Sequence, residues 1–275
     1  MVSPGDDSAR VARAVARDLE ADALEPGPSD LAERAPRVDI VEAGRRLTAG
    51  RARDVGRELA GDAETLLFVD ADCRLPAGAV ALLAEALDDD GRAAVGASVS
   101  SSGRPRIVAW LRHLLEFKDA EPGAGNGTPW LVPSAALLVR ADALDRAGGF
   151  PDLYPGEDWV LCARLRELGL TVRRLDTVVV DHVHPPGWGR MFAHQYRLGL
   201  TSALARTMAA LPGAAFARRP VLVPLLFAGR LGRGTLWMLT NRPRELPLFI
   251  LLFPLYVAAL ATWTAGFAAG ASRRR

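Results

Sequence analysis

The chain has 275 residues, which is enough for one large domain or for one domain with an appendage. Its formal net charge of +2 gives no electrostatic reason to expect a nucleic acid as partner. Hydrophobic residues make up 49% of the chain, and the excess lies towards the C-terminus.

Cysteine usage and the N-terminal residues indicate the compartment. The two cysteines, Cys73 and Cys162, fall in elements that we expect to be buried, and no zinc-binding spacing is present. The first residues lack the basic start and apolar core of a signal peptide. Lys118 is the only lysine, which together with the abundance of Ala and Gly indicates a GC-rich bacterial genome. A reduced, cytoplasmic setting fits these observations.

Strands and helices alternate along most of the chain, which predicts a mainly parallel sheet in a three-layer α/β sandwich. The predicted strands are the end of a strand before Ser8, then Arg37–Val41, Thr65–Val69, Ala93–Val99, Ala135–Val139, Val172–Leu175 and Val178–Val180. The predicted helices are Ser8–Leu24, Gly50–Leu59, Pro76–Leu87, Ile107–Phe117, Glu157–Leu168 and Met191–Leu211.

Two carboxylates end one of these strands. Leu66–Val69 is a continuous apolar run, typical of a buried parallel strand, and Asp70 and Asp72 follow it with one residue between them. Alternation would point both carboxylates the same way, at the edge of the sheet where α/β folds bind ligands. Such a pair suits a hard divalent cation that also holds a diphosphate. The alternative is a strand followed by a solvated acidic turn.

Two further segments make this pair more specific. Arg140–Phe150 ends in Gly-Gly-Phe, and Gly156–Leu165 contains Glu157-Asp158 where a helix should open. Together with the Asp-x-Asp strand end, these segments resemble the family 2 glycosyltransferases of the GT-A fold in both order and separation. The resemblance covers about residues 3–199. It departs from the family at the start, because the apolar first strand that leads into the nucleotide site is missing.

The resemblance implies a nucleotide-sugar donor and a divalent metal, Mn²⁺ or Mg²⁺. Asp72 would be the direct metal ligand, with Asp70 nearer the ribose and a metal-bound water. Family members often have a histidine after the last strand, and His182 and His184 occupy that position. Either could complete the metal shell or contact the diphosphate, and a surface position is the alternative for each.

The resemblance also assigns residues to the nucleotide. Asp6 or Asp7 would lie near the nucleobase. Arg53 would help to hold the nucleotide, although Asp54 follows it where the family usually has Asn. Arg197, in a weak form of the family's Gln-x-x-Arg-Trp element, could clamp a phosphate with its planar fork. The alternative for Arg197 is a basic helix face near a membrane.

Asp158 is the candidate general base for the acceptor hydroxyl, with Glu157 orienting the site or contacting the acceptor. A helix start favours an ionised carboxylate. Acids are also frequent as helix caps, so a purely capping Asp158 is the alternative.

The C-terminal region differs from the rest. Leu246–Gly270 contains no charged residue and is long enough to span a bilayer, with arginines on both sides. Val221–Leu239 is apolar but includes Arg230 and Arg233, so it could be a poorer span or an interfacial helix. We therefore predict a GT-A domain over residues 1–199 and a membrane-associated helical region over 200–275, with 246–270 as the span.

These observations support an inverting, metal-dependent glycosyltransferase on the cytoplasmic membrane, with its catalytic domain facing the cytoplasm, where nucleotide sugars are made. The acceptor would be a lipid, a glycan or another component of the cell envelope. The alternative is a non-catalytic, membrane-bound binding or assembly protein on a degenerate GT-A fold. Another nucleotidyl enzyme with the same metal edge is a third reading, because fold alone does not settle chemistry.

Overall fold

A computed structural model describes residues 39–43, 45–88, 91–101, 106–123 and 131–273. The chain divides into two compact units, residues 1–48 and residues 49–275. In the described part of the first unit, the expected strand over 37–41 does not form at residues 39–41, and a single bridge residue occurs at Glu42. Asp6, Asp7 and the helix expected over residues 8–24 lie outside the described residues.

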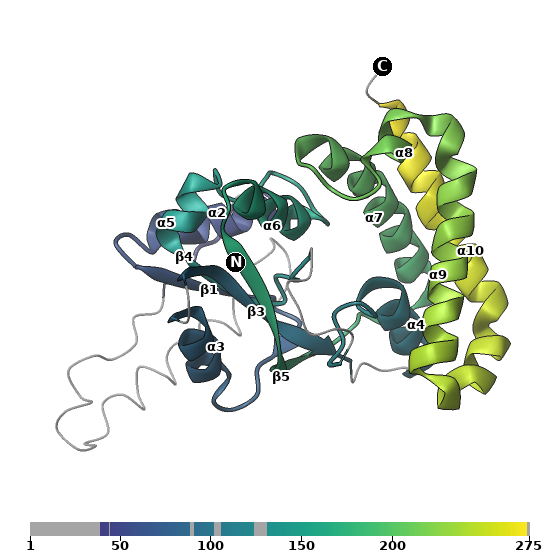
Figure 1. The fold of residues 1–275 in the computed structure, drawn as a ribbon, viewed down its shortest axis with the longest axis horizontal. Coiled ribbons are helices and arrows are strands. Elements are labelled where there is room, and N and C mark those ends of the chain that lie inside the picture. Colours follow the sequence, from purple (N-terminus) through teal and green to yellow (C-terminus); the bar gives the residue numbers. More distant parts are fainter. Residues whose placement is uncertain (1–38, 44, 89–90, 102–105, 124–130, 274–275) are drawn as a thin grey trace. The chain divides into compact units, whose positions relative to one another are not determined.

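The second unit contains a five-stranded sheet with helices on both of its faces (Figure 1). Its strand order is β1-β4-β3-β5-β2. The strands are β1 (Thr65–Val69), β2 (Cys73–Arg74), β3 (Arg92–Ser100), β4 (Ala136–Arg140) and β5 (Thr171–His182). The two strands predicted at Val172–Leu175 and Val178–Val180 are one continuous strand, β5, with an irregular pairing between Ala97 and Ser98 on β3.

Strand direction is where the sequence prediction was wrong. Of the pairings between described strands, only β3 with β5 is parallel, whereas β1/β4, β3/β4 and β2/β5 are antiparallel. The cause is the long connection from residue 101 to residue 135, which leaves β3 and re-enters at the end of β1, where Ala136 pairs with Val69. Residues just before β4 therefore lie beside the carboxyl end of β1.

Successive side chains along the strands point to opposite faces of the sheet, and each face carries an apolar core. Ala94 and Val139 belong to the core on one face, with residues of α5 (Ala141–Arg146) and α6 (Glu157–Glu167). Val95 and Leu138 belong to the core on the other face, with residues of α3 (Ala79–Asp88). Helix α2 (Ala49–Leu59) lies on the same side of the sheet as α5 and α6 (Figure 1). The expected three-layer α/β sandwich is confirmed, with a mixed sheet in place of a mainly parallel one.

The remaining helices pack together beside the sheet (Figure 1). They are α4 (Arg106–Glu116), α7 (Trp188–Met208), α8 (Ala214–Arg218), α9 (Val223–Asn241) and α10 (Leu246–Ser272), with short 3-10 turns at Pro220–Leu222 and Pro243–Glu245. Residue 199, the predicted end of the GT-A domain, lies inside α7. The apolar side chains of α4, α7, α9 and α10 share one core.

Glycines bring α7 and α10 unusually close. A Cβ atom built on Gly199 would lie 1.9 Å from the carbonyl oxygen of Trp263, and one built on Gly266 would lie 2.0 Å from that of Tyr196. Gly270 makes a similar approach to Leu200. Only glycine allows such backbone contact, so these positions fix how the two helices pack.

One helix in the described part of the chain is long and apolar enough to cross a membrane. It covers Pro243–Ser272 with a mean hydropathy of 2.0, and 33% of its apolar window is buried against the rest of the structure. Length and composition alone do not distinguish a spanning helix from one that packs on a protein surface.

Candidate active site

Acidic, histidine and thiol side chains gather at one edge of the sheet, which we call the acid edge. It is defined by Asp70, Asp72, Cys73, Glu157, Asp158 and His182. The ends of β1 and β5, strand β2 and the start of α6 provide these residues. The backbone joins the strands here, because Asp70 N donates to Ala135 O at 3.2 Å and Val183 N donates to Asp72 O at 2.8 Å.

Arg53 on α2 links two of these carboxylates. Its Nη2 lies 2.5 Å from Asp70 Oδ1 and its Nη1 lies 2.5 Å from Glu157 Oε1, and the side chain is 10% exposed. Burial acts to lower the pKa of Arg53, but Asp70 and Glu157 outweigh it and raise that pKa. Burial also raises the pKa of each carboxyl group, which Arg53 partly offsets. Arg53 therefore stays charged and holds Asp70 and Glu157 in fixed positions.

The Gly-Gly-Phe segment packs against this arginine. Gly148 and Gly149 have φ angles of 76° and 69°, which favour glycine, and they turn the chain after α5. Phe150 then lies under Arg53, with the guanidinium carbon 5.3 Å from its ring centre. Phe150 N donates to Asp54 Oδ1 at 3.0 Å. Asp54, the departure from the family's Asn, thus uses an oxygen that an Asn side chain would also present.

Asp158 lies in the first turn of α6, beside Glu157. Gly156 is the N-cap residue and no side chain caps the helix there. Asp158 Oδ1 accepts a hydrogen bond from Trp159 N at 2.9 Å, and Oδ2 accepts one from Ser134 N at 3.3 Å. Burial, followed by the neighbouring Glu157, raises the pKa of Asp158 well above its ordinary value. The carboxylate thus serves the helix start while having the perturbed pKa typical of a proton-transfer group.

Asp72, Cys73 and His182 form the one cluster in the described ranges whose ligand atoms are spaced for a metal ion, all within 4.8 Å of one another. His182 Nε2 lies 3.6 Å from Asp72 Oδ1. Burial raises the pKa of the Cys73 thiol, so sulfur is a poor ligand here and the carboxylate and imidazole are the better donors. Asp70 and His184, which the sequence also suggested as ligands, lie outside this cluster.

His184 lies deeper than His182. It is 1% exposed, the two ring centres are 4.5 Å apart, and neither ring nitrogen of His184 has a hydrogen-bond partner among the described residues. Burial lowers the pKa of His184 to about 3, so the ring is neutral. Phe117 contacts both histidines, with ring centres 5.0 Å from His182 and 5.8 Å from His184.

A second buried polar network, on α4, was not predicted. Glu116 lies 3.7 Å from Arg112 and 3.5 Å from His194, and it accepts a hydrogen bond from Gln195 Nε2 at 3.0 Å. Burial acts to raise the pKa of Glu116, but His194 and Arg112 outweigh it and lower the pKa to about 2. The signal in the sequence was the i, i+4 pair of opposite charges inside an apolar helix.

Arg197 has a different environment from Gln195, its neighbour in the weak family element. Gln195 is fully buried against Glu116, whereas Arg197 is exposed and its side chain has no ion pair with any described residue. The predicted contact between Arg197 and a phosphate stays a prediction.

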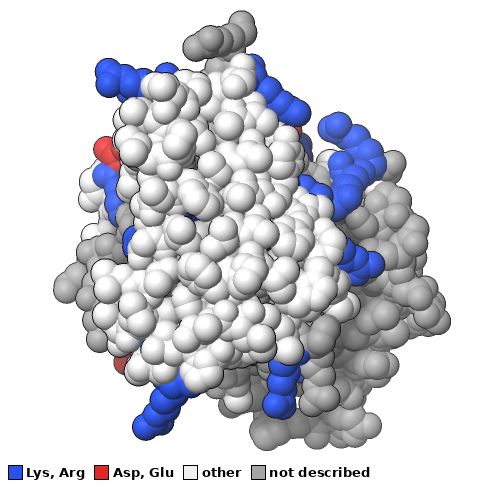
Figure 2. Space-filling model, turned by 90° about the vertical axis from the view of Figure 1, so that its right-hand side faces the viewer, with Lys and Arg blue, Asp and Glu red and all other residues white. Residues whose placement is uncertain are grey.

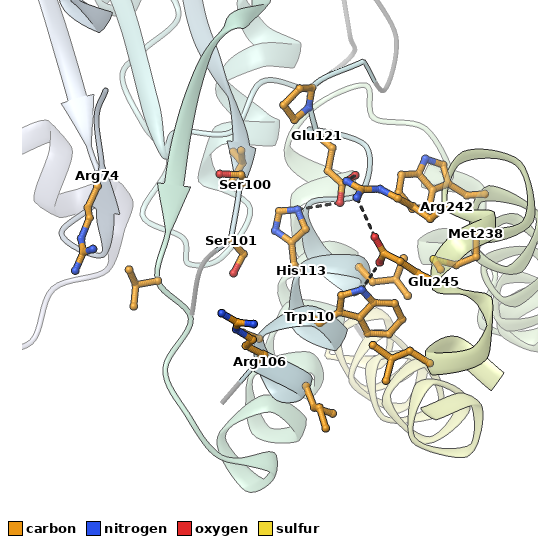
Figure 3. A pocket seen from close by; sticks show the side chains of 18 residues that line it. Arg74, Ser100, Ser101, Arg106, Trp110, His113, Glu121, Met238, Arg242 and Glu245 are labelled. Atoms are coloured by element: carbon orange, nitrogen blue, oxygen red, sulfur yellow. Dashed lines mark hydrogen bonds and ion pairs between the residues drawn. The ribbon is translucent and has the colours of Figure 1, made fainter. Parts of the chain in front are cut away.

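A cavity of about 1100 Å³ lies between the sheet and the C-terminal helices (Figure 3). Arg74 and Val183 line it, and each directly follows a residue of the acid edge. Its floor contains ion pairs and hydrogen bonds that join His113 to Glu121, Glu121 to Arg242, and Glu245 to both Arg242 and Trp110. Arg74 and Arg106 are exposed at the cavity, while Trp110, Trp237, Met238 and Leu248 provide apolar walls.

Comparison with known sequences identifies the family. A family model described as "Glycosyl transferase family group 2" matches residues 65–265, from β1 to the last part of α10. The chain belongs to this family. The match includes the acid edge, the Gly-Gly-Phe segment and the start of α6, so the family residues predicted from the sequence lie within it, apart from Asp6, Asp7 and Arg53.

Curated relatives match this member of glycosyl transferase family group 2 over a short stretch. The pre-mycofactocin glycosyltransferases of Mycobacterium tuberculosis strains CDC 1551 / Oshkosh and ATCC 25618 / H37Rv are each 39% identical over 64 residues. That stretch is 23% of this chain and 14% of each relative. The chain therefore matches only a small part of the length of these relatives.

Solved structures of glycosyltransferases are among the chains to which this one is similar. The mannosyltransferase PcManGT from Pyrobaculum calidifontis, in complex with GDP-Man and Mn²⁺, is 17% identical with a TM-score of 0.48, covering 86% of this chain and 70% of its own. S. aureus TarS 1-349, in complex with UDP-GlcNAc, is 15% identical with a TM-score of 0.42, covering 98% and 80%. These similarities are low, so the family assignment depends on the sequence match to the family model.

Proposed function

We propose that the protein transfers a sugar from a nucleotide-sugar donor to an acceptor hydroxyl in one inverting step. The observation that carries this proposal is the placement of Asp158, a partly buried carboxylate at the acid edge of a family 2 chain, in the same site as Arg53, Asp70 and Glu157. The local identity with pre-mycofactocin glycosyltransferases supports glycosyl transfer as the reaction class.

Asp158 would act as the general base. As the acceptor oxygen forms its bond to the anomeric carbon, its proton passes to an Asp158 oxygen. The bond from that carbon to the diphosphate breaks on the opposite side, and the electron pair leaves with the nucleoside diphosphate. The raised pKa suits this task, because a base works best when its pKa lies near the operating pH.

Arg53 and Asp70 would fix the nucleotide side of the site. Both terminal nitrogens of Arg53 are engaged by carboxylates, so its charge serves to position them. Asp70 keeps about a third of its side chain exposed and can accept a hydrogen bond from a ribose hydroxyl. Glu157 Oε2 is buried with no hydrogen-bond partner among the described residues, which leaves one unpaired acceptor beside Arg53 and Asp70.

A divalent cation fits the acid edge at Asp72 and His182. A carboxylate with an imidazole suits Mn²⁺ better than Mg²⁺, which prefers oxygen ligands alone. When bound, the cation would neutralise charge on the leaving diphosphate. His182 Nδ1 is buried without a partner among the described residues, so this ring is held by packing against Phe117 and His184.

The cavity beside Arg74 and Val183 is our candidate for the acceptor. Exposed Arg74 and Arg106 would contact an anionic group, and the walls at Trp110 and Trp237 would contact an apolar or ring-shaped part. A lipid-linked or glycan acceptor of the cell envelope has this combination. Helices α9 and α10, which form part of the wall, would attach the protein to the cytoplasmic membrane with the acid edge facing the cytoplasm.

The test is donor turnover by the full chain. Purified protein would be incubated with UDP- and GDP-sugars and Mn²⁺, Mg²⁺ or a chelator, and release of nucleoside diphosphate would be followed. We expect one donor to be turned over in Mn²⁺ and not in chelator, and Asp72→Asn to lose metal-dependent donor binding by calorimetry. Donor binding without turnover or transfer would instead favour the non-catalytic membrane protein.

Asp158→Asn separates the base from a purely structural carboxylate. Loss of a general base typically costs on the order of a hundredfold or more in rate, whereas the single Asn oxygen can still accept one of the two backbone hydrogen bonds that Asp158 accepts. We expect the variant to stay folded with a loss of about 1 kcal/mol in stability, to bind donor normally and to lose turnover. Asp152→Asn, at an exposed position in the segment before α6, is the matched control and should keep turnover. Near-normal transfer by Asp158→Asn would remove Asp158 as the base.

A further inference from the structure

The outward surface of α9 and α10 is mostly apolar. On each helix a set of exposed apolar residues recurs mostly every three or four positions and forms a stripe, and on α9 the exposed Arg233, Thr240 and Asn241 lie beside or beyond it. On α9 the stripe is Leu225, Gly229, Gly232, Leu236 and Leu239, and on α10 it is Pro247, Ile250, Leu251, Pro254, Ala258, Ala261 and Ala265. Ile250 and Leu251 are 70% and 72% exposed, which is unusual for two adjacent large apolar side chains.

Basic residues surround this apolar face. Figure 2 shows a broad area without charged side chains, with Lys and Arg side chains predominating around its margin. Exposed arginines stand at both ends of the helix pair: Arg218 and Arg219 before α9, Arg244 between the helices, and Arg273 after α10. An apolar face with a basic margin complements a bilayer surface that carries anionic headgroups.

The inward surface of the same helices is held by the rest of the unit. The three glycine contacts described above join α10 to α7, and a Cβ on Gly234 of α9 would lie 1.8 Å from the Tyr256 hydroxyl oxygen of α10. Arg233 of α9 forms an ion pair with Asp119, just after α4, with Nη1 3.2 Å from Oδ1. Arg230 lies over the ring of Trp263, with its guanidinium carbon 3.9 Å from the ring centre.

This packing conflicts with a helix surrounded by lipid. Helix α7, which contacts α10 through backbone, also exposes Arg190 and Arg197, and charged side chains facing hydrocarbon are costly. For α10 to cross a bilayer, α7 and the sheet beside it would have to enter the hydrocarbon as well, or the glycine contacts would have to break. The span predicted from composition at residues 246–270 is therefore better explained as a helix with one face in protein and one face in lipid headgroups.

We propose that α9 and α10 lie in the plane of an anionic membrane surface, with their apolar stripes inserted at the headgroup level and their arginines on acidic lipid headgroups. This inference rests on the membrane attachment included in the proposed function and specifies its mode as interfacial, without a crossing. The occupant of the apolar face is the bilayer.

The test uses the full chain and vesicles of phosphatidylcholine, with or without one third phosphatidylglycerol. We expect flotation with the anionic vesicles, at least tenfold weaker binding to the neutral ones, and release by sodium carbonate at high pH, which removes peripheral proteins and leaves spanning proteins in place. Retention after carbonate would overturn the interfacial mode in favour of a span. Failure to bind vesicles by a chain that elutes as a dimer would assign the face to a second copy.

Paired charge insertions identify the docking face. Ile250→Glu with Leu251→Glu should weaken binding to anionic vesicles at least tenfold. The control, Val80→Glu with Leu82→Glu, adds the same charge at exposed apolar positions on α3, where the side chains are 54% and 43% exposed, and should bind as the wild type does. Equal loss in both variants would mean that net charge, and not the α9–α10 face, decides binding.

Two further measurements keep the result interpretable. Arg218→Gln with Arg219→Gln should reduce binding to anionic vesicles while leaving the weak binding to neutral vesicles unchanged. Melting temperatures should stay near that of the wild type, because all these positions are exposed. Donor hydrolysis in detergent should persist in the Ile250/Leu251 variant. Lost docking with intact hydrolysis therefore concerns the membrane face alone, whereas absent hydrolysis in every variant concerns the proposed function.

Discussion

Charged groups at the acid edge and on the α9–α10 face are arranged in opposite ways. At the acid edge the side chains of Arg53, Glu157 and Asp158 point into the protein, and the positive charge of Arg53 compensates the two carboxylates. On the α9–α10 face, the charges stand at the margin and the exposed stripes are uncharged. Changing one charge at the acid edge should therefore disturb several partners, whereas adding one on the helix face should change only what that surface binds.

Removing Arg53 tests this contrast most severely. Arg53→Met would leave Asp70 and Glu157 without their counter-charge, and breaking a buried ion pair typically costs about 3–5 kcal/mol. We expect the free energy of unfolding, measured in urea, to fall by an amount near the lower end of that range, because Asp70 is partly exposed. Arg51→Met, which breaks the exposed pair with Glu58 on the same helix, should cost less than about 1 kcal/mol. Equal losses of stability in the two variants would show that the ion pairs of Arg53 contribute no more than an exposed pair does.

The pH dependence of turnover is the next largest effect. Burial and Glu157 raise the pKa of Asp158 to about 7, in a site that also contains Arg53 and Asp70. A base must be ionised, so kcat/KM should fall about tenfold for each pH unit below that value. This decrease in kcat/KM on the acid side should be absent in Asp158→Asn. A flat profile between pH 5 and pH 8 would contradict the assignment.

The raised pKa of Asp158 affects folding stability in the opposite direction to its effect on turnover. The folded state holds this proton more tightly than the unfolded chain, so ionising Asp158 costs folding free energy as the pH rises from about 4 to about 7. Mild acid should therefore lower turnover while the contribution of Asp158 to folding stability increases. Thermal melting of Asp158→Asn should lack that contribution, which makes the variant the control for both measurements.

Helix packing offers a smaller test on the other region. Gly266→Ala would force its new methyl group against Tyr196 O, and overpacking of this kind typically costs about 1–3 kcal/mol. Gly229→Ala on α9 meets no atom within 4 Å and should stabilise the helix by about 0.5–1 kcal/mol. Thermal melting of the two variants in opposite directions would support the close α7–α10 contact. A neutral Gly266→Ala would mean that the helices are further apart.

The smallest expected effect is at Asp54. Asp54→Asn keeps the oxygen that accepts the Phe150 N–H, so stability should change by less than about 0.5 kcal/mol. Asp54→Ala removes that acceptor and should cost about 1 kcal/mol. If Asn is as damaging as Ala in chemical unfolding, the carboxylate charge matters more than its hydrogen bond.

Much of the site could be predicted because short patterns carry it. A short apolar strand that ends in Asp-x-Asp, and Glu-Asp at a helix start, are local features, and the structure has both at the expected residues. His182 and His184, which the resemblance placed after the last strand, also lie side by side, with ring centres 4.5 Å apart. The family match covers both of these segments.

Strand direction and buried charge could not be predicted in the same way. An apolar run such as β1 is the same in parallel and antiparallel pairing, and the direction of β4 depends on where a long connection re-enters the sheet. The Glu116 network depends on side chains of α7, which lies 70 or more residues further along the chain. The inference that α10 does not cross the membrane depends on backbone contacts of Gly199 and Gly266, which hydropathy does not register.

The contact between α7 and α10 has a consequence for which acceptors can react. Because the backbones touch at Gly199, Gly266 and Gly270 with no side chains between them, α10 and its proposed membrane face lie at a short, well-defined spacing from α7. Arg206 of α7 extends that link, since its guanidinium lies 5.8 Å from the ring centres of both Phe267 and Trp159, the residue after Asp158. A chain docked in this way would hold its base at a fixed height above the bilayer. Acceptors would then be selected by how far their hydroxyl group projects from the membrane.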